Sequence, residues 1–317
     1  MPSKTGSYSR VNNLAPKLWS LVSACASILP PLIIRTINMD ISILTYLSNL
    51  AFIGVFLIVI FASKWLYHFT TPYSTFSEII DKKNLALGIS VVGFISANAI
   101  IYSAVLTGPS QGLQTDLLEV GQYTVLGMVL LLVSRLINDK ILLHSFCNHR
   151  QIIAKQSIAV GLAQASCYIT SALVIGGALT GEGDFASALV FYALGQLLLV
   201  LFAKTYDLFT KFSLLQELEK GNIAAATSFA ATTIALGIIL LHALAGEFVS
   251  WQSSITLFIR DALLAFVVLP VVRLLVDKLL IPSVNIDCAI KKEHNVAVAL
   301  LEGSVAVSVA LVIFFAL

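Results

Sequence analysis

Residues 296–317 read VAVALLEGSVAVSVALVIFFAL, an apolar run interrupted by the carboxylate of Glu302. About 20 apolar residues are enough to cross a bilayer as a helix. The same pattern occurs earlier in the chain, where residues 158–179 read IAVGLAQASCYITSALVIGGAL and Gln164 stands in the place of Glu302. The two stretches predict a membrane protein that contains an internal duplication.

The composition agrees with this prediction, because 58% of the 317 residues are hydrophobic and only 11% are charged. A globular chain carries about 25% charged residues. Eight runs are long and apolar enough to span: 43–63, 85–106, 117–136, 157–179, 185–203, 223–244, 253–276 and 296–316. We expect helices throughout, since lipid offers no hydrogen-bond partner to an open backbone. The lipid bilayer is therefore the expected environment, and a net charge of +2 gives no indication of a nucleic-acid partner.

The connections between the runs alternate in charge, which predicts the orientation of the chain. Lysine and arginine flank the first, third, fifth and seventh connections, whereas the second, fourth and sixth contain acidic residues and no lysine or arginine. Because basic connections are retained in the cytoplasm, we expect a multi-pass membrane protein with its C-terminus outside.

Residues 1–42 form a separate N-terminal part in this interpretation. A polar tail precedes the apolar stretch 18–34, which is short and contains Pro30 and Pro31. Two adjacent prolines usually end a helix. The stretch is predicted either to lie at the membrane interface or enter it partway, or to form a short additional span.

A constant offset in residue number relates the rest of the chain to itself. The offset that connects Arg135 with Arg273 also connects Asp139 with Asp277, and it continues without a gap through the last spans. We therefore predict two four-helix repeats, 43–180 and 181–317. Four spans return the chain to its starting side, so the repeats are expected to be parallel and related by a pseudo-two-fold axis along the membrane normal.

Short motifs in both repeats resemble the bacterial inner-membrane family known as domain of unknown function 350. The first copy has Thr71-Pro72 and then Asn84-Leu85-Ala86, the second has Gly221-Asn222 and Ala224-Ala225, and Arg135 and Arg273 match the basic end of the family's third span. The fourth spans depart from the family, which commonly has an Asn-Ala-Ala-Cys-Met run there. The resemblance implies four-helix units, single or paired, and no established chemistry. Genes of the family often lie beside polyamine-linked ligases and membrane-remodelling proteins.

Two asparagines open helices at equivalent places. Asn84 and Asn222 each precede an apolar run, and an asparagine side chain there accepts a hydrogen bond from a free backbone N–H. We interpret both as helix N-caps.

Polar residues inside the spans are the candidate site. Arg260 and Asp261 lie in the seventh span, Glu302 lies in the eighth, and the offset makes Gln122 and Gln164 the equivalents of Arg260 and Glu302 in the first repeat. Charged groups at this depth require a partner or water. We expect the pairs Arg260–Glu302 and Gln122–Gln164, which either hold helices together or line a polar cavity or cation path in which Glu302 titrates.

No enzyme motif is present, and the four cysteines lack metal-binding spacing, so neither a reaction nor a metal or other cofactor is predicted. The leading hypothesis is a transporter, channel or sensor for a small cation, proton or polyamine. The alternative is a scaffold without transport activity that anchors a cytoplasmic protein through its basic loops in an envelope-stress or membrane-remodelling system. Self-association is compatible with both.

Overall fold

The computed structural model describes residues 43–108, 110–144, 147–180, 185–246, 250–280, 282 and 285–316. The N-terminal stretch 18–34 lies outside these residues. Helix packing is described within residues 52–317, which form one compact unit. Eight helices in the described part of the chain are long and apolar enough to cross a membrane.

The eight long helices follow the predicted spans closely. They are α3 (Ile43–Phe69), α5 (Leu85–Val105), α6 (Leu113–Ile137), α7 (Ile158–Thr180), α8 (Phe185–Phe209), α10 (Ile223–Leu244), α11 (Trp251–Leu275) and α13 (Val296–Ala316). The largest difference is that α3 and α8 continue more than a helical turn beyond their predicted ends. Both extensions contain a lysine, Lys64 or Lys204, whose aliphatic stem can pack along the helix while its charge stays in water.

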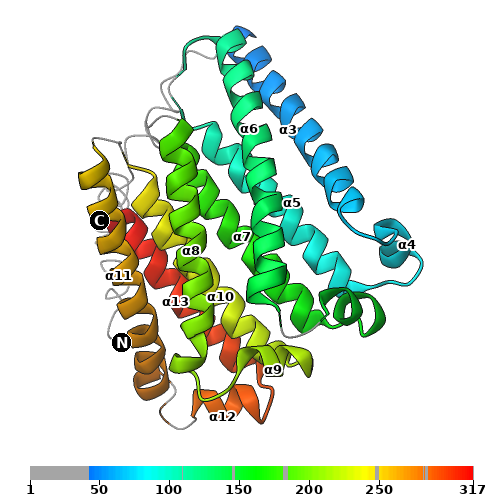
Figure 1. The fold of residues 1–317 in the computed structure, drawn as a ribbon, viewed down its shortest axis with the longest axis vertical. Helices are drawn as coiled ribbons and strands as arrows, with labels where there is room; N and C mark the ends of the chain where they lie inside the picture. The colour runs from blue at the N-terminus through cyan, green and yellow to red at the C-terminus, as the bar shows by residue number, and fades with distance from the viewer. Residues whose placement is uncertain are drawn as a thin grey trace, which may run out of the picture. The chain divides into compact units, whose positions relative to one another are not determined.

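Short helices that the hydropathy pattern does not predict fill the connections. They are the α-helices α4 (Thr75–Ile80), α9 (Leu214–Glu219) and α12 (Ile286–Lys291) and the π-helical turns η1 (Asn138–Leu142), η2 (Arg150–Ala154) and η3 (Val276–Leu280). All of them follow α3, α6, α8 or α11, and Figure 1 shows α4, α9 and α12 beyond the same end of the long helices. We call this end, where the basic connections lie, the basic end.

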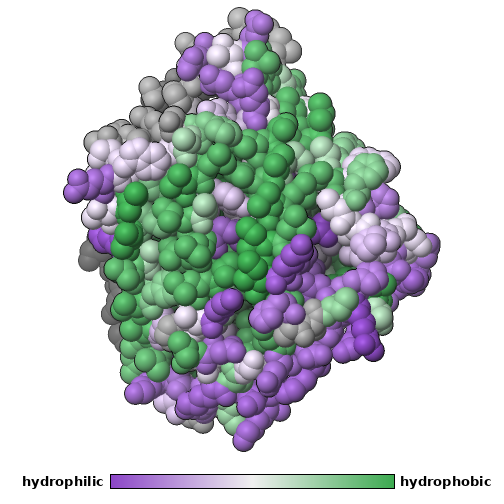
Figure 2. Space-filling model, in the orientation of Figure 1, coloured by the Kyte–Doolittle hydropathy of each residue, from purple (hydrophilic) through white to green (hydrophobic). Residues whose placement is uncertain are grey.

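The long helices form two layers. The second and fourth helices of each repeat pack in one row, in the order α5, α7, α10, α13. Helices α6, α8 and α11 cover this row, as Figure 1 shows. Their outer face carries a broad apolar band with polar residues at both ends (Figure 2). This distribution is that of an integral membrane protein, since lipid surrounds the middle of the bundle and water its ends.

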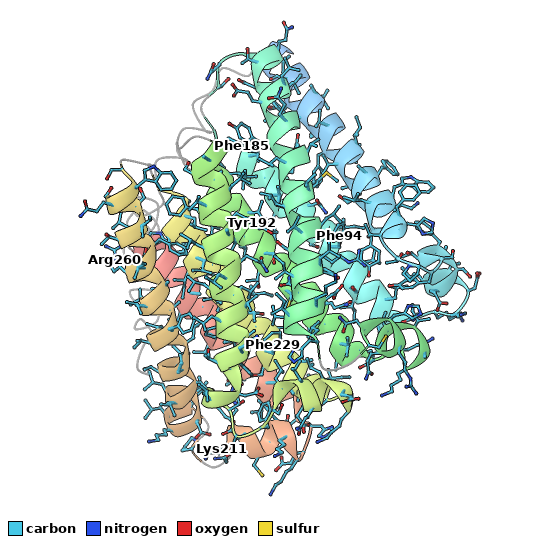
Figure 3. The ribbon with its side chains drawn as sticks, viewed as in Figure 1. Phe94, Phe185, Tyr192, Lys211, Phe229 and Arg260 are labelled. Carbon is cyan, nitrogen blue, oxygen red and sulfur yellow. The ribbon has the colours of Figure 1, made fainter. Side chains whose placement is uncertain are left out.

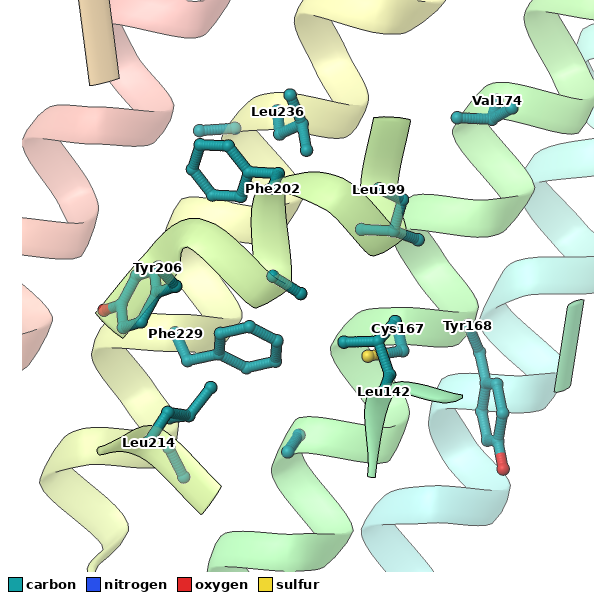
Figure 4. Close-up of a cluster of buried hydrophobic side chains, with 14 of the residues drawn as sticks. Leu142, Cys167, Tyr168, Val174, Leu199, Phe202, Tyr206, Leu214, Phe229 and Leu236 are labelled. Atoms are coloured by element: carbon teal, nitrogen blue, oxygen red, sulfur yellow. The ribbon is translucent and has the colours of Figure 1, made fainter. Parts of the chain in front are cut away.

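Small residues set the distance between neighbouring helices of the row. A Cβ atom added at Gly93 of α5 would collide with the Cα of Ala165 on α7. Without a hydrophobic driving force inside lipid, such close backbone contact is the main source of attraction between helices. Larger side chains fill the space between the layers, where Phe202, Tyr206 and Phe229 cluster (Figure 4).

The predicted caps are confirmed. The side chain of Asn84 accepts from Leu87 N at 3.0 Å, and that of Asn222 accepts from Ala225 N at 3.2 Å. Each amide also donates across the bundle at 2.9 Å, Asn84 to the Ile152 carbonyl and Asn222 to the Ile290 carbonyl. The asparagines therefore join two connections of each repeat at the basic end, in addition to starting a helix.

Asn222 also donates to the buried carboxylate of Glu217, and Lys220 does so at 2.8 Å. Burial raises the pKa of Glu217, but these hydrogen bonds and the positive charge outweigh it and leave the pKa below its ordinary value. A carboxyl with a lowered folded-state pKa stabilises the fold above its unfolded pKa. This contribution is lost as the pH falls through the folded value.

The two repeats are parallel, as predicted, but they contact each other through two different helices and not through the same helix of each repeat. The fourth helix of the first repeat, α7, packs on the second helix of the second repeat, α10. A closed two-fold arrangement would also bring α5 against α13, and these two helices make no comparable contact within the described residues. Small residues allow the close contact of α7 and α10, since a Cβ added at Gly177 or Gly237 would collide with the other helix.

Candidate functional site

The second repeat contains a cluster of charged side chains near the basic end. Arg273 comes from the last turn of α11, Asp287 from α12 and Glu302 from the second turn of α13. Arg273 donates to Glu302 through Nη1 and to Asp287 through Nη2, the latter at 2.8 Å. One guanidinium thus links three helices and holds two carboxylates.

Two hydroxyl groups complete this cluster. Ser228 of α10 donates to Glu302 Oε2 at 2.8 Å. Its oxygen lies 2.9 Å from the Tyr206 hydroxyl of α8 and 3.2 Å from Arg273 Nη1. Because the single hydrogen of Ser228 is used toward Glu302, Tyr206 donates to Ser228. The chain Tyr206–Ser228–Glu302 holds the carboxylate in one orientation.

The cluster is nearly closed to solvent at Glu302 and slightly exposed at Arg273 and Asp287. The side chain of Glu302 is 4% exposed, whereas those of Arg273 and Asp287 are 11% and 17% exposed. A cavity of about 20 Å³ adjoins it, lined by Glu302, Arg273, Thr232 and apolar side chains. This volume accommodates about one water molecule.

Pro270, which also lines the cavity, lies inside α11 one turn before Arg273. Proline has no N–H, so the carbonyl of Phe266 loses its usual helical donor at this point. Leu132 stands at the equivalent position of the first repeat. The proline therefore removes one backbone hydrogen bond of α11 beside the charged cluster in the second repeat, and it has no counterpart in the first.

The first repeat contains the same framework with a balanced charge. Ser90 donates to Gln164 at 2.8 Å, and Gln164 donates to Asp139 at 3.1 Å. Arg135 donates to Thr70 Oγ1 at 2.7 Å, lies 4.3 Å above the ring of Tyr67, and approaches Asp139 only to 3.9 Å. Aromatic faces attract a guanidinium, so Arg135 is stabilised here without a close carboxylate.

The two predicted interhelical pairs are wrong. Arg260 is 61% exposed and bonds to its neighbour Asp261, which is buried, at 2.8 Å. The continuous helix between Arg260 and Arg273 extends over about 20 Å along its axis, and Figure 3 shows Arg260 toward the end of α11 away from Lys211. The guanidinium of Arg260 cannot cross that axial distance, so Glu302 pairs with Arg273, which lies at the same height along the bundle.

The same axial distance separates the two glutamines of the pair predicted in the first repeat. Gln122 is exposed on α6, at the level of Arg260, whereas Gln164 is buried with Ser90 and Asp139 near the basic end. The structure thus keeps Glu302 and Gln164 in equivalent polar clusters and leaves Arg260, Asp261 and Gln122 outside them.

Comparison with known proteins agrees with the duplicated fold. The model of the family described as Domain of Unknown Function (DUF350) matches residues 40–179 and again residues 182–317. The chain belongs to this family. The two matches correspond to the two four-helix repeats, so both polar clusters occupy equivalent places in two DUF350 units.

The DUF350 chain is also similar to a UPF0719 transmembrane protein of Aquifex aeolicus (strain VF5). The two are 29% identical over 127 residues, which is 38% of this chain and 46% of that relative. The match therefore spans about half of the relative's length. No solved structure matches the chain.

Sequence reasoning missed the roles of Arg273, Ser228 and Asp287. The place of Arg273 in the sequence predicts only a cation at the end of its helix, although it is the main partner of Glu302. A signal was present, because Ser90 and Ser228 are related by the same offset as Gln164 and Glu302. Asp287 had no such signal, since His149 is its equivalent in the first repeat.

Proposed function

We propose that this DUF350 protein senses or passes protons through the cluster of Arg273, Asp287 and Glu302. The observation that supports the proposal is the charge imbalance of that cluster. Two carboxylates share one guanidinium there, whereas in the described part of the first repeat the one carboxylate paired with Arg135 is that of Asp139. A surplus buried negative charge is costly, and one proton removes it.

The surroundings of Glu302 favour a proton over a larger cation. The adjoining cavity has room for about one water molecule and a mostly apolar lining. A metal cation requires several oxygen ligands, and Arg273 would repel it at contact distance. A polyamine exceeds the cavity and meets the same repulsion. A proton needs neither space nor a ligand shell.

A proton on Glu302 would change how the helices are held. The neutral carboxyl loses its ionic attraction to Arg273, while Asp287 retains the guanidinium. The connection of α11 to α13 is then weaker than that of α11 to α12. In the orientation given by the positive-inside rule, the basic end faces the cytoplasm of a bacterium and the C-terminus lies outside, so Asp287 would receive protons from the cytoplasmic side.

The test is a distance measurement between spin labels at Lys278→Cys, beyond α11, and Ala297→Cys, at the start of α13, with the native cysteines replaced and the protein in liposomes. We expect the distance distribution to change on acidification. Glu302→Gln should show the acid distribution already at neutral pH. Glu219→Gln, the same change at an exposed position of the basic end, should behave as the unmodified protein.

Identical distributions at every pH in all three proteins would contradict the proposal. Proton flux into the same liposomes, driven by a potassium diffusion potential, separates passage from sensing. Flux that disappears in Glu302→Gln indicates passage, and a pH-dependent distance without flux indicates sensing.

A scaffold remains the second candidate, and the packing of the inner row favours it. The contacts between α5, α7, α10 and α13 are as close as backbone atoms allow at several glycines. At the basic end, a pocket of about 310 Å³ between the repeats is lined by Lys155, Lys220, Glu219 and Gln151 among others. A cytoplasmic protein would dock there. Absence of both flux and pH-dependent movement would favour this candidate.

A further inference from the structure

The contact between the two repeats joins two different surfaces. Helices α7 and α10 run parallel from the basic end, and a Cβ added at Gly237 of α10 would lie 2.9 Å from Leu173 Cδ1 and 3.2 Å from Thr170 Cα. A Cβ added at Gly177 of α7 would lie 2.8 Å from Leu244 Cβ. The two backbones therefore approach each other closely along most of the bundle.

Such a contact is heterologous, because a fourth-helix surface meets a second-helix surface. Each repeat has both surfaces. Within the chain, the fourth-helix surface of the first repeat contacts the second-helix surface of the second repeat. Heterologous contacts do not saturate in a pair and continue into a ring or a row unless something blocks them. A fourth-helix surface remains on α13 and a second-helix surface on α5.

The surface left on α13 is the equivalent, in the second repeat, of the one that α7 buries. We call it the α13 face, and it consists of Ala297, Leu301, Ser304, Ser308, Leu311 and Phe315. All six residues are exposed, whereas their equivalents on α7 are buried or half-buried. Over the whole span, 5 residues of α13 are buried against 17 of α7. Among the residues that the structure describes, the α13 face therefore lacks the covering that its counterpart has.

The surface left on α5 is the equivalent, in the first repeat, of the one that α10 buries. We call it the α5 face, and it consists of Gly88, Val92, Ala99, Ser103 and Leu106. Each of these residues is exposed or half-buried, and a Cβ added at Gly88 would meet nothing within 4 Å. Small residues in a lipid-facing stripe favour close approach of another helix.

The polar groups of these faces do not oppose burial. Ser304 donates to the Leu301 carbonyl at 2.8 Å, and Ser308 donates to the Ser304 carbonyl at 2.7 Å. Their hydrogens are thus satisfied inside α13. Thr170, the equivalent of Ser308, lies in the contact between α7 and α10. One difference is that Phe315 replaces Gly177, so the ends of the helices away from the basic end must lie further apart than those of α7 and α10.

We propose that the α13 face of one copy packs on the α5 face of a second copy, as α7 packs on α10 within the chain. Copies then add head to tail in the plane of the membrane. The partner is a second copy because the same two surfaces already fit together inside each chain. Copies in one membrane also share the parallel orientation that this contact requires.

Cysteine cross-linking in native membranes tests the proposal. Two differently tagged proteins without native cysteines carry either Ser308→Cys on the α13 face or Ala99→Cys on the α5 face, the equivalents of the neighbours Thr170 and Gly237. We expect a disulfide-linked heterodimer when both are produced in one cell and oxidised, and no dimer from either alone. A matched control pairs Ser308→Cys with Val129→Cys, which is exposed on α6.

Three results would overturn the proposal. Equal cross-linking with Val129→Cys, or none with Ala99→Cys, would mean that lipid covers the two faces. A further variant keeps Cys25 and carries Ser308→Cys. A disulfide between these two cysteines within one molecule would mean that the apolar stretch 18–34 covers the α13 face instead.

Discussion

Replacing Arg273 with methionine is expected to lower the free energy of unfolding by about 3–5 kcal/mol, the usual loss when one partner of a buried ion pair is removed. The substitution leaves Glu302, of which 4% is exposed, without its cationic partner, and it frees Asp287 as well. Methionine keeps much of the volume of the aliphatic stem. Reversible unfolding in mixed detergent micelles measures the change.

The equivalent substitution Arg135→Met is the control, and we expect a smaller loss. Arg135 is held by the Thr70 hydroxyl and the Tyr67 ring, and its carboxylate lies 3.9 Å away. Adding Glu302→Gln to Arg273→Met should recover part of the lost stability, since the amide removes the uncompensated charge. Equal losses from both arginines, or simply additive effects of Arg273→Met and Glu302→Gln, would contradict the assigned pair.

Gly161→Ala is expected to lower the free energy of unfolding by about 1–3 kcal/mol, as overpacking of a close contact typically does. Its Cβ would collide with the backbone carbonyl of Ala86 on α5. Backbone atoms cannot rotate away as the end of a side chain can, so α5 and α7 must separate. The same unfolding measurement tests this expectation.

Gly121→Ala provides a matched control on α6, where an added Cβ meets nothing within 4 Å. Alanine is the better helix former by up to about 1 kcal/mol, so this change should leave stability unaltered or raise it. Losses of the same size at Gly121 and Gly161 would contradict the assignment of the loss to the close contact of α5 and α7, because Gly121 makes no such contact.

The spans, the duplication and the caps could be predicted because each depends on local sequence. Apolar runs of membrane length give the helices, and Asn84 and Asn222 start helices through contacts within the first turn. The constant offset gives the two repeats, which the two family matches confirm. These features require no knowledge of which helix faces which.

The partner of Glu302 could not be predicted from depth in the membrane alone. The depth of Glu302 in the membrane led to a prediction of partners among charged residues in the middle of other spans, whereas Arg273 lies at a helix end.

The two tyrosines that bond to the clusters could not be predicted for a different reason. Tyr67 and Tyr206 bond to equivalent serines yet do not obey the constant offset, because the segment from Glu217 to Asn222 is one position shorter than that from Glu78 to Asn84.

The proposed function requires that Glu302 takes up a proton within the cluster of the second repeat. Infrared difference spectroscopy of the protein in lipid, recorded between neutral and acidic pH, tests it most directly. We predict a band from a buried protonated carboxyl group in the unmodified protein and in Glu219→Gln, and its loss in Glu302→Gln. A band that persists in Glu302→Gln, or disappears only in Asp287→Asn, would contradict the claim.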